Sequence, residues 1–258
     1  MDWKKESEMF NRAADYYDRY RPSYPQDIID TIIKETGIKN GSKLIEIGAG
    51  SGKATELFAG KGFEILCIEP GEDLVRKGNE KFKNDKILFQ CSRFEDYDFP
   101  DQEWDVIFAA QAFHWVPQPQ GYEKCASVLK NNGHLAIFWN MYITYDNALD
   151  NELLAISNKY GGFADFLSEK DCETRIHSIV SQIENSKLFS RPKVFRKLWR
   201  QDYTAGEYFG FTLTGNRFIQ KSEEEKAAAY QDLVHLSNKY GGVIQRPYLC
   251  VLYLAEKL

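Results

Sequence analysis

The 258-residue sequence lacks the features that would place a protein in a membrane, in a secretory route or on nucleic acid. It has no run of about eighteen apolar residues, and its first ten residues have no apolar stretch like that of a signal peptide. It also has no long basic tract, and its formal net charge is −5. These absences argue against a membrane span and against binding to nucleic acid or an anionic membrane surface.

A disulfide framework and a metal cluster are not expected either. The five cysteines are scattered, odd in number and free of any CxxC pair. This usage predicts a cytoplasmic protein with reduced thiols and no zinc site. Apolar residues make up 43% of the chain, enough for a substantial core in one elaborated domain or in a core with an attached cap.

Short apolar segments alternate with helix-like segments in the first half of the chain. This alternation is typical of a parallel sheet covered by helices on both faces. The expected strands are 43–47, 63–68, 86–91, 104–110 and 133–139, and the expected helices are about 53–60, 71–83 and 119–130.

The flanking regions are more helical. Two helices are expected within residues 7–36, others within 146–187 and 222–239, and strands at 193–203 and 247–257. These patterns predict four parts: a helical cap segment (1–40), a ligand-binding core (41–140), a helical cap insertion (141–190) and strands and helices that complete the core sheet (191–258).

The segment SNKYGG occurs twice, at 157–162 and 237–242. No other similarity flanks the two copies, so they do not indicate a repeated domain. Each follows a helical run and ends in glycine, which predicts two helix C-termini with the same stop signal.

The segment LIEIGAGSGKATELF places Gly48, Gly50 and Gly52 directly after the first expected strand. Open parallel sheets bind ligands at the carboxyl ends of their strands, and glycine leaves no Cβ between chain and ligand. Glu69 ends the second strand nineteen residues after Gly50, where an acid accepts hydrogen bonds from ribose hydroxyls. The pattern predicts a nucleoside site, and the alternative is a turn that only packs a helix on a strand.

The spacing GxGxG differs from the GxGxxG of most dinucleotide sites. Acidic residues would also gather at this rim, because Glu46 precedes the loop and Asp73 and Glu95 follow later strands. A ligand with positive charge and no phosphate suits such a rim, which favours S-adenosylmethionine over a nicotinamide dinucleotide.

On these residues the chain resembles the class I S-adenosylmethionine-dependent methyltransferases. Within them it is most similar to the small-molecule group that includes the trans-aconitate methyltransferase-like proteins. The segments that carry the resemblance are LIEIGAGSGKATELF, CIEP, SRFEDYDFP, WDVIFAAQAFHWV, YDRYRPSYP and YLCVLYLAEK. The resemblance implies a Rossmann-like α/β fold, a seven-stranded, mostly parallel sheet with an antiparallel last strand, and a helical cap.

The resemblance also implies roles for residues around the cofactor. The loop from Gly48 to Gly52, with Ala49 and Gly50, would approach the methionine part, and Glu46 would help to hold its ammonium group. Glu69, followed by Pro70, would bind the ribose.

Four further positions complete the implied cofactor site. Phe94 and Glu95 would hold the adenine, and Gln111 would lie near the methionine or methyl end. Tyr17 and Arg21 would close over the cofactor carboxylate, since an arginine–carboxylate contact is strong and directional. The alternatives are a solvated loop acid for Glu95, a buried Tyr17 and a surface Arg21.

The methyl acceptor is expected to be a small molecule, with no nucleic-acid or membrane partner. His114 is the candidate catalytic base if the acceptor is a neutral hydroxyl or amine, and its alternative role is a histidine within an aromatic wall. A carboxylate acceptor would need no base. Its charge could be balanced by Arg21, Lys159 or Arg175, and aromatic residues could wall the pocket: Trp115, Trp139, Tyr142 and Tyr145.

Two other functions stay open on the sequence alone. A Rossmann core can also carry a nicotinamide-dependent oxidoreductase, and a protein that binds S-adenosylmethionine can be a regulator without enzymatic activity. The segment AQAFHW lacks the Asn/Asp-Pro-Pro-Tyr-like pattern of many enzymes that methylate amino nitrogens of bases. This absence favours an oxygen nucleophile such as a small organic acid.

Overall fold

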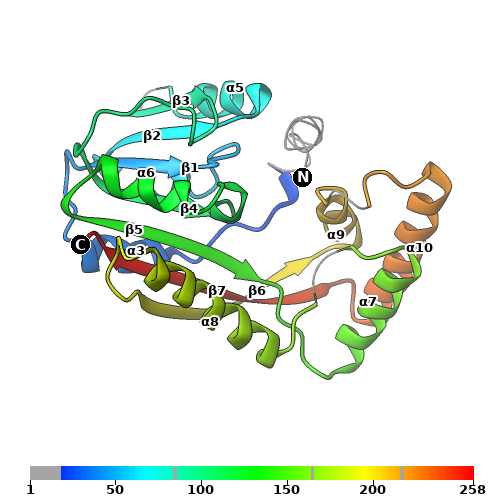
Figure 1. Ribbon diagram of the computed structural model, residues 1–258. Coiled ribbons are helices and arrows are strands. Elements are labelled where there is room, and N and C mark those ends of the chain that lie inside the picture. Colours follow the sequence, from blue (N-terminus) through cyan, green and yellow to red (C-terminus); the bar gives the residue numbers. More distant parts are fainter. Residues whose placement is uncertain (1–18, 84–85, 164–165, 216–217) are drawn as a thin grey trace. The chain divides into compact units, whose positions relative to one another are not determined.

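The computed structural model describes residues 19–83, 86–163, 166–215 and 218–258 (Figure 1). These residues fall into two compact units. The larger unit contains residues 23–140, 174–197 and 250–258. The smaller unit contains residues 141–173 and 198–249 together with the described residues before Ser23.

The larger unit holds most of one seven-stranded sheet. The strands are β1 (Lys43–Ile47), β2 (Glu64–Glu69), β3 (Ile87–Cys91), β4 (Trp104–Ala110), β5 (Leu129–Met141), β6 (Lys193–Tyr203) and β7 (Ile244–Glu256), in the order β3-β2-β1-β4-β5-β7-β6. The pairs β1–β2, β1–β4, β2–β3 and β4–β5 are parallel. The predicted fold class, with an antiparallel last strand, is confirmed.

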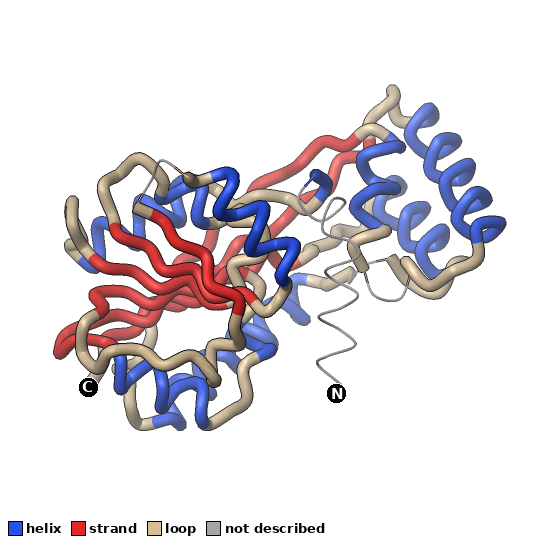
Figure 2. The backbone as a smooth tube through the Cα atoms, turned by 90° about the horizontal axis from the view of Figure 1, so that it is seen from above, coloured by secondary structure: helices blue, strands red, loops and turns tan. Residues whose placement is uncertain are grey.

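Helices flank this sheet on both faces (Figure 2). They are α3 (Gln26–Thr36), α4 (Thr55–Phe58), α5 (Glu72–Lys81), the 3-10 helix η1 (Phe113–Trp115), α6 (Gln120–Val128) and α8 (Glu169–Ser186). The ends of α3 follow from its sequence: Pro25 precedes the first helical residue, and Gly37 ends the helix with a φ of 68°. Its isoleucines at 28, 29 and 32 are buried because they recur on one face.

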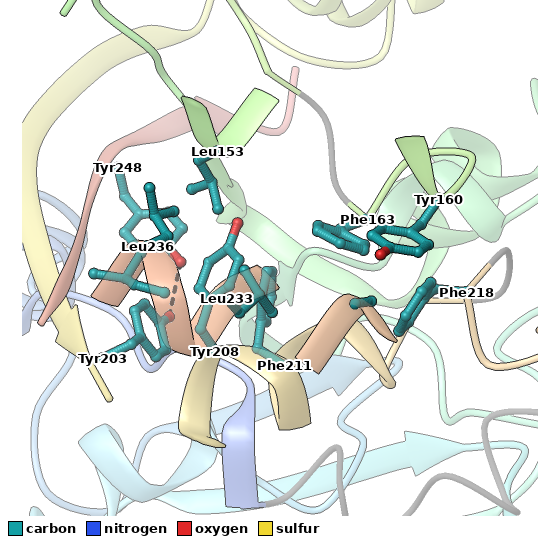
Figure 3. Packing of buried hydrophobic residues seen from close by; sticks show 12 residues of the cluster. Leu153, Tyr160, Phe163, Tyr203, Tyr208, Phe211, Phe218, Leu233, Leu236 and Tyr248 are labelled. Atoms are coloured by element: carbon teal, nitrogen blue, oxygen red, sulfur yellow. Dashed lines mark hydrogen bonds between the residues drawn. The ribbon is translucent and has the colours of Figure 1, made fainter. Parts of the chain in front are cut away.

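The smaller unit contains α7 (Ala148–Lys159), α9 (Ala205–Thr212) and α10 (Glu223–Lys239), together with parts of β6 and β7. Its core is rich in aromatic residues, and the hydroxyls of Tyr203 and Tyr248 lie 2.7 Å apart within it (Figure 3). A buried ion pair joins β7 to α7: Arg246 Nη1 donates to Asp150 Oδ1 at 3.0 Å, and both side chains are nearly inaccessible.

The two SNKYGG segments behave as predicted. They end α7 and α10, and in both copies the N–H of the second glycine donates to the carbonyl of the serine, from Gly162 to Ser157 and from Gly242 to Ser237, at 2.8 Å. The glycines have φ between 76° and 94°, which explains why both helices stop there.

The structure differs from the sequence-based expectation in three respects. Strand β5 begins at Leu129 instead of residue 133, and α9 was not expected. The boundaries of the parts also differ, because residues 23–40 and 174–190 belong to the larger unit, whereas residues 198–249 belong to the smaller one. Helix α3 packs against the core through buried isoleucines, which is why this segment is not part of a separate cap.

No helix among the described residues is long and apolar enough to cross a membrane.

Candidate functional site

The glycine loop follows β1 at the carboxyl edge of the sheet. Gly48, Gly50 and Gly52 have φ values of 64°, 58° and 87°, which side chains with a Cβ rarely adopt. The N–H groups of Gly48 and Ala49 donate to the Ile68 carbonyl at 2.8 and 3.3 Å, and the N–H of Gly50 donates to Glu69 Oε2 at 2.9 Å. Three successive loop donors are therefore occupied by the next strand.

Two of these glycines are also required by packing. A Cβ on Gly48 would lie 2.5 Å from the Cβ of Ala112, and a Cβ on Gly52 would lie 2.5 Å from the Phe82 ring. Packing thus accounts for part of the motif, as the alternative interpretation of the loop proposed. The contact with Ala112 also places the segment after β4 directly against the loop.

Glu69 links the loop to the end of β2. It is 8% exposed, and its two carboxylate oxygens accept the N–H groups of Gly50 and Gly71 at 2.9 Å each. Burial raises the pKa of Glu69, and these two hydrogen bonds oppose the shift. Each oxygen retains a lone pair, so the carboxylate can still accept a hydroxyl, as the ribose prediction requires.

Glu46 lies in β1, two residues before Gly48 of the loop, and is 1% exposed. Thr55 Oγ1, in the first turn of α4, donates to Glu46 Oε2, and the Cys67 thiol lies 3.9 Å from the same oxygen. Burial raises the pKa of Glu46 to about 8, against the opposing hydrogen bond from Thr55 and with a smaller contribution from the Glu69 charge. A cationic group bound nearby would favour the ionised carboxylate.

The segment after β4 brings two predicted residues to the same edge of the sheet. Gln111 has a φ of 58°, which is unusual for a residue with a side chain, and its N–H donates to the Phe138 carbonyl at 2.9 Å. Its Oε1 is buried, and no protein group among the described residues bonds to it. A buried acceptor without a partner fits a donor group of a ligand.

His114 lies in η1, three residues beyond Gln111. Its Nδ1 accepts a hydrogen bond from Trp139 Nε1 at 3.3 Å, and its ring centroid is 4.8 Å from that of Trp115. Its side chain reaches solvent, and partial desolvation by the surrounding protein lowers its pKa. A proton-accepting role for His114 remains a prediction.

The predicted adenine residues have partners within the protein. Phe94 is buried and packs against Phe99 with ring centroids 5.4 Å apart, and Glu95 forms an ion pair with Arg93. Asp73, further along the rim, pairs with Arg76 at 2.9 Å. Their contacts with adenine therefore remain predictions.

Of the residues predicted to bind an anion from the cap, some are located by the structure and one lies outside the described residues. Arg21 belongs to the smaller unit, where its Nη1 donates to the Tyr142 hydroxyl at 2.9 Å and its Nη2 to the Thr214 carbonyl at 3.3 Å. Tyr17 lies outside the described residues. Lys159 pairs with Asp232 at 2.7 Å, and Arg175 is exposed on α8, so neither is held in a buried anion site.

Comparison with known proteins agrees with this geometry. Residues 45–137 match the family described as "Methyltransferase domain". These residues form a class I S-adenosylmethionine-dependent methyltransferase domain. S-adenosylmethionine is the cofactor of such domains. The contacts of Glu69 and Gln111 with this cofactor stay predictions.

Two curated relatives resemble this chain in sequence. An uncharacterized methyltransferase of Mycobacterium tuberculosis is 28% identical over 131 residues, which cover 51% of each chain. A protein of Saccharomyces cerevisiae named a probable S-adenosylmethionine-dependent methyltransferase is 28% identical over 165 residues, which cover 62% of this chain and 55% of the relative. The chain spans about half the length of the curated relatives it matches.

Two solved structures share the fold. One, described as a type II methyltransferase from Anaeromyxobacter dehalogenans, has a TM-score of 0.62 and 16% identity, with 91% of this chain and 97% of that chain covered. A phosphoethanolamine N-methyltransferase of Haemonchus contortus has a TM-score of 0.54 and 13% identity, with 96% and 57% covered. The similarity to the trans-aconitate methyltransferase-like group stays a prediction.

Sequence reasoning missed three partners of the predicted residues. Thr55 bonds to Glu46, Gly71 bonds to Glu69, and Trp139 bonds to His114. The first two have local signals, because Thr55 lies in the turn after the glycines and Gly71 directly follows the Glu-Pro pair. The third depends on the pairing of β4 with β5, which no local pattern reveals.

Proposed function

We propose that this chain transfers a methyl group from S-adenosylmethionine to a small-molecule acceptor. The atom that is methylated is an oxygen of the acceptor, in a carboxylate or another oxygen nucleophile. The observation that carries the proposal is the Glu69 bridge: one buried carboxylate fixes the N–H groups of Gly50 and Gly71 and keeps acceptor capacity at the end of β2. A cytoplasmic location is part of the proposal and follows from the scattered cysteines.

The occupied loop donors support this ligand over a nicotinamide dinucleotide. A pyrophosphate is normally bound by N–H groups of the glycine loop and by the N-terminus of the helix that follows. Here the N–H groups of Gly48, Ala49 and Gly50 already have protein acceptors, and α4 is only four residues long. Burial raises the pKa of Glu46 to about 8, so a bound cation would favour its ionised form, whereas a phosphate would not.

Methyl transfer to an ionised oxygen depends on the positioning of the acceptor and the cofactor more than on proton transfer. The cofactor supplies an electrophilic methyl group on a sulfonium. A bond forms between the acceptor oxygen and the methyl carbon while the methyl–sulfur bond breaks and leaves its electron pair on sulfur. A carboxylate is already ionised, so alignment and exclusion of water supply the acceleration, worth up to about 7–11 kcal/mol in well-oriented systems.

In this proposal different residues bind different parts of the cofactor. Glu69 binds the ribose hydroxyls, Glu46 attracts the positive end of the cofactor, and the Gln111 oxygen accepts a donor at the methionine end. Arg21 stays a predicted partner of the cofactor carboxylate, and its contacts with Tyr142 and Thr214 do not test that role.

A binding experiment separates the proposal from its oxidoreductase rival. Isothermal calorimetry with S-adenosylmethionine, S-adenosylhomocysteine and a nicotinamide dinucleotide is expected to show binding of the first two only. Tight binding of the dinucleotide without binding of S-adenosylmethionine would contradict the proposal.

A transfer experiment separates an enzyme from a regulator. Carboxylic acids, phenols and amines are assayed with cofactor that carries a labelled methyl group, and labelled product is expected among the carboxylic acids or phenols. A protein that binds the cofactor but labels no compound would be a regulator, and activity confined to amines would refute the oxygen nucleophile.

A further inference from the structure

The pair His114–Trp139 suggests a role for the histidine that the predicted base does not cover. The indole Nε1–H of Trp139 can only donate, so the His114 Nδ1 atom at 3.3 Å must be the acceptor. A neutral imidazole that accepts at Nδ1 carries its proton at Nε2. The contact therefore selects one tautomer.

The sheet fixes this contact. Strands β4 and β5 are parallel neighbours, and their register sets Ala110 opposite Phe138, so Trp139 of β5 lies beside the segment that follows β4. The indole of Trp139 also packs against the Tyr253 ring of β7, with centroids 5.8 Å apart in an edge-to-face arrangement. The tautomer is thus set by contacts between strands of the sheet.

The other nitrogen of His114 faces outward. No protein group among the described residues bonds to Nε2, and the residue is exposed to solvent. His114 lies two residues after Ala112, which is the residue that Gly48 of the glycine loop packs against. The N–H donor therefore belongs to the segment that packs against the loop, at the carboxyl edge of the sheet where the ligand is expected.

We propose that His114 is a neutral hydrogen-bond donor that uses Nε2–H to orient an anionic oxygen of the methyl acceptor, and that Trp139 is the positioning residue that fixes its tautomer. This inference rests on the proposed function. It makes an oxygen anion the preferred nucleophile, because an amine nitrogen that attacks through its lone pair gains nothing from a donor aimed at it.

The electrostatics agree with a donor role. A base must hold a free lone pair towards the substrate, but Nδ1 is engaged by Trp139 and Nε2 carries the proton. Burial by the surrounding protein lowers the pKa of His114, so the ring is neutral at neutral pH. The aromatic neighbours Trp115 and Trp139 bring no charge of their own to the ring.

The first test reads the tautomer without any catalysis. Nitrogen NMR of the ¹⁵N-histidine-labelled protein is expected to show His114 with a protonated Nε2 and an unprotonated Nδ1, with the signal assigned by its loss in His114→Gln. Trp139→Phe removes the donor and keeps an aromatic ring. It should mix the two tautomers and raise the His114 pKa towards its ordinary value, since the neutral form loses a hydrogen bond.

The second test distinguishes a donor from a base. In His114→Gln the side-chain amide can place an N–H near the Nε2 position but has no basicity, whereas His114→Ala has neither. A donor role predicts that His114→Gln stays within about threefold of wild type in kcat/KM, while His114→Ala loses about 10- to 150-fold, the usual worth of a hydrogen bond to a charged group.

Each alternative gives a different result. Equal losses of about 10²–10⁴-fold in both variants would show that His114 acts as a base and would overturn the inference. Wild-type activity in both variants, or a His114 signal with a protonated Nδ1, would overturn it as well. Failure of the proposed function is distinguishable, because wild-type protein would then transfer no methyl group although the NMR result stands.

Discussion

The ionisation of Glu46 gives a sharp prediction about cofactor binding. Its pKa of about 8 means that at pH 7 about nine in ten molecules hold the carboxyl protonated. Ionising it at pH 7 costs about 1.4 kcal/mol, which is a factor of ten in affinity. If the cofactor's positive charge binds to the ionised carboxylate, binding at pH 7 must release nearly one proton, and affinity should rise about tenfold between pH 6 and pH 7.

The assay is calorimetric titration with S-adenosylmethionine in buffers of different ionisation enthalpy, which counts the protons released. Glu46→Gln is the matched control. Its side-chain oxygen can still accept the hydrogen bond from Thr55, but the glutamine side chain does not titrate. The comparison is made at pH 6–7, where the cofactor's own α-amino group, which titrates near pH 7.7–8.0, is mostly protonated. Equal proton counts for wild type and Glu46→Gln would refute the link between Glu46 and the cofactor's charge.

The same shift predicts how stability depends on pH without ligand. A carboxyl whose pKa is raised on folding contributes fully below its unfolded value of 4.5, and its contribution is lost as pH rises towards 8. The loss has an upper bound of about 5 kcal/mol. Glu46→Gln should therefore flatten the decline of the free energy of unfolding between pH 5 and 8, measured by urea denaturation.

The remaining predictions concern fixed contacts. Glu69→Gln leaves one of two buried N–H groups without an acceptor and should weaken cofactor binding by about 1.5–3 kcal/mol in calorimetry, whereas unchanged affinity would remove Glu69 from the ribose site. Gly52→Ala should lower the free energy of unfolding by about 1–3 kcal/mol more than Gly60→Ala does. Both glycines have positive φ, but only at Gly52 would the added Cβ lie 2.5 Å from a neighbour. Equal losses would mean that backbone strain alone explains the glycine at position 52. Arg246→Met should cost about 3–5 kcal/mol by leaving the Asp150 carboxylate buried without its cation, and adding Asp150→Asn should recover part of the loss.

Most strands were predictable because they are buried on both faces and read as short apolar runs. The pattern failed at the start of β5, where Lys130, Asn131 and Asn132 are polar and Asn132 has a φ of 63°. Helix α9 was missed because AGEYFGFT contains two glycines and four residues of modest helix propensity. Burial of Tyr208 and Phe211 holds it as a helix, and the only local signal was the capping box of Thr204 and Glu207.

The candidate site was predictable to the extent that it depends on strand ends. Glu69 and the glycines follow from the rule that ligands bind at the carboxyl edge of a parallel sheet. The partner of His114 could not be predicted, because it depends on which strand pairs with β4 and in which register. The sequence identifies Trp139 as an aromatic residue near a strand end, but only the register makes it a donor to Nδ1.

The glycine loop shows why sequence interpretation left two explanations open. Gly48 and Gly52 cannot carry a Cβ because Ala112 and Phe82 occupy that space, so packing alone would require them. The N–H of Gly50 is bound by Glu69, an acid that packing does not require at the end of β2 and that costs free energy to bury. A buried carboxylate with spare acceptor capacity is retained at such a cost when a ligand uses it, so the ligand-binding role rests on the contact between Gly50 and Glu69 and not on the number of glycines.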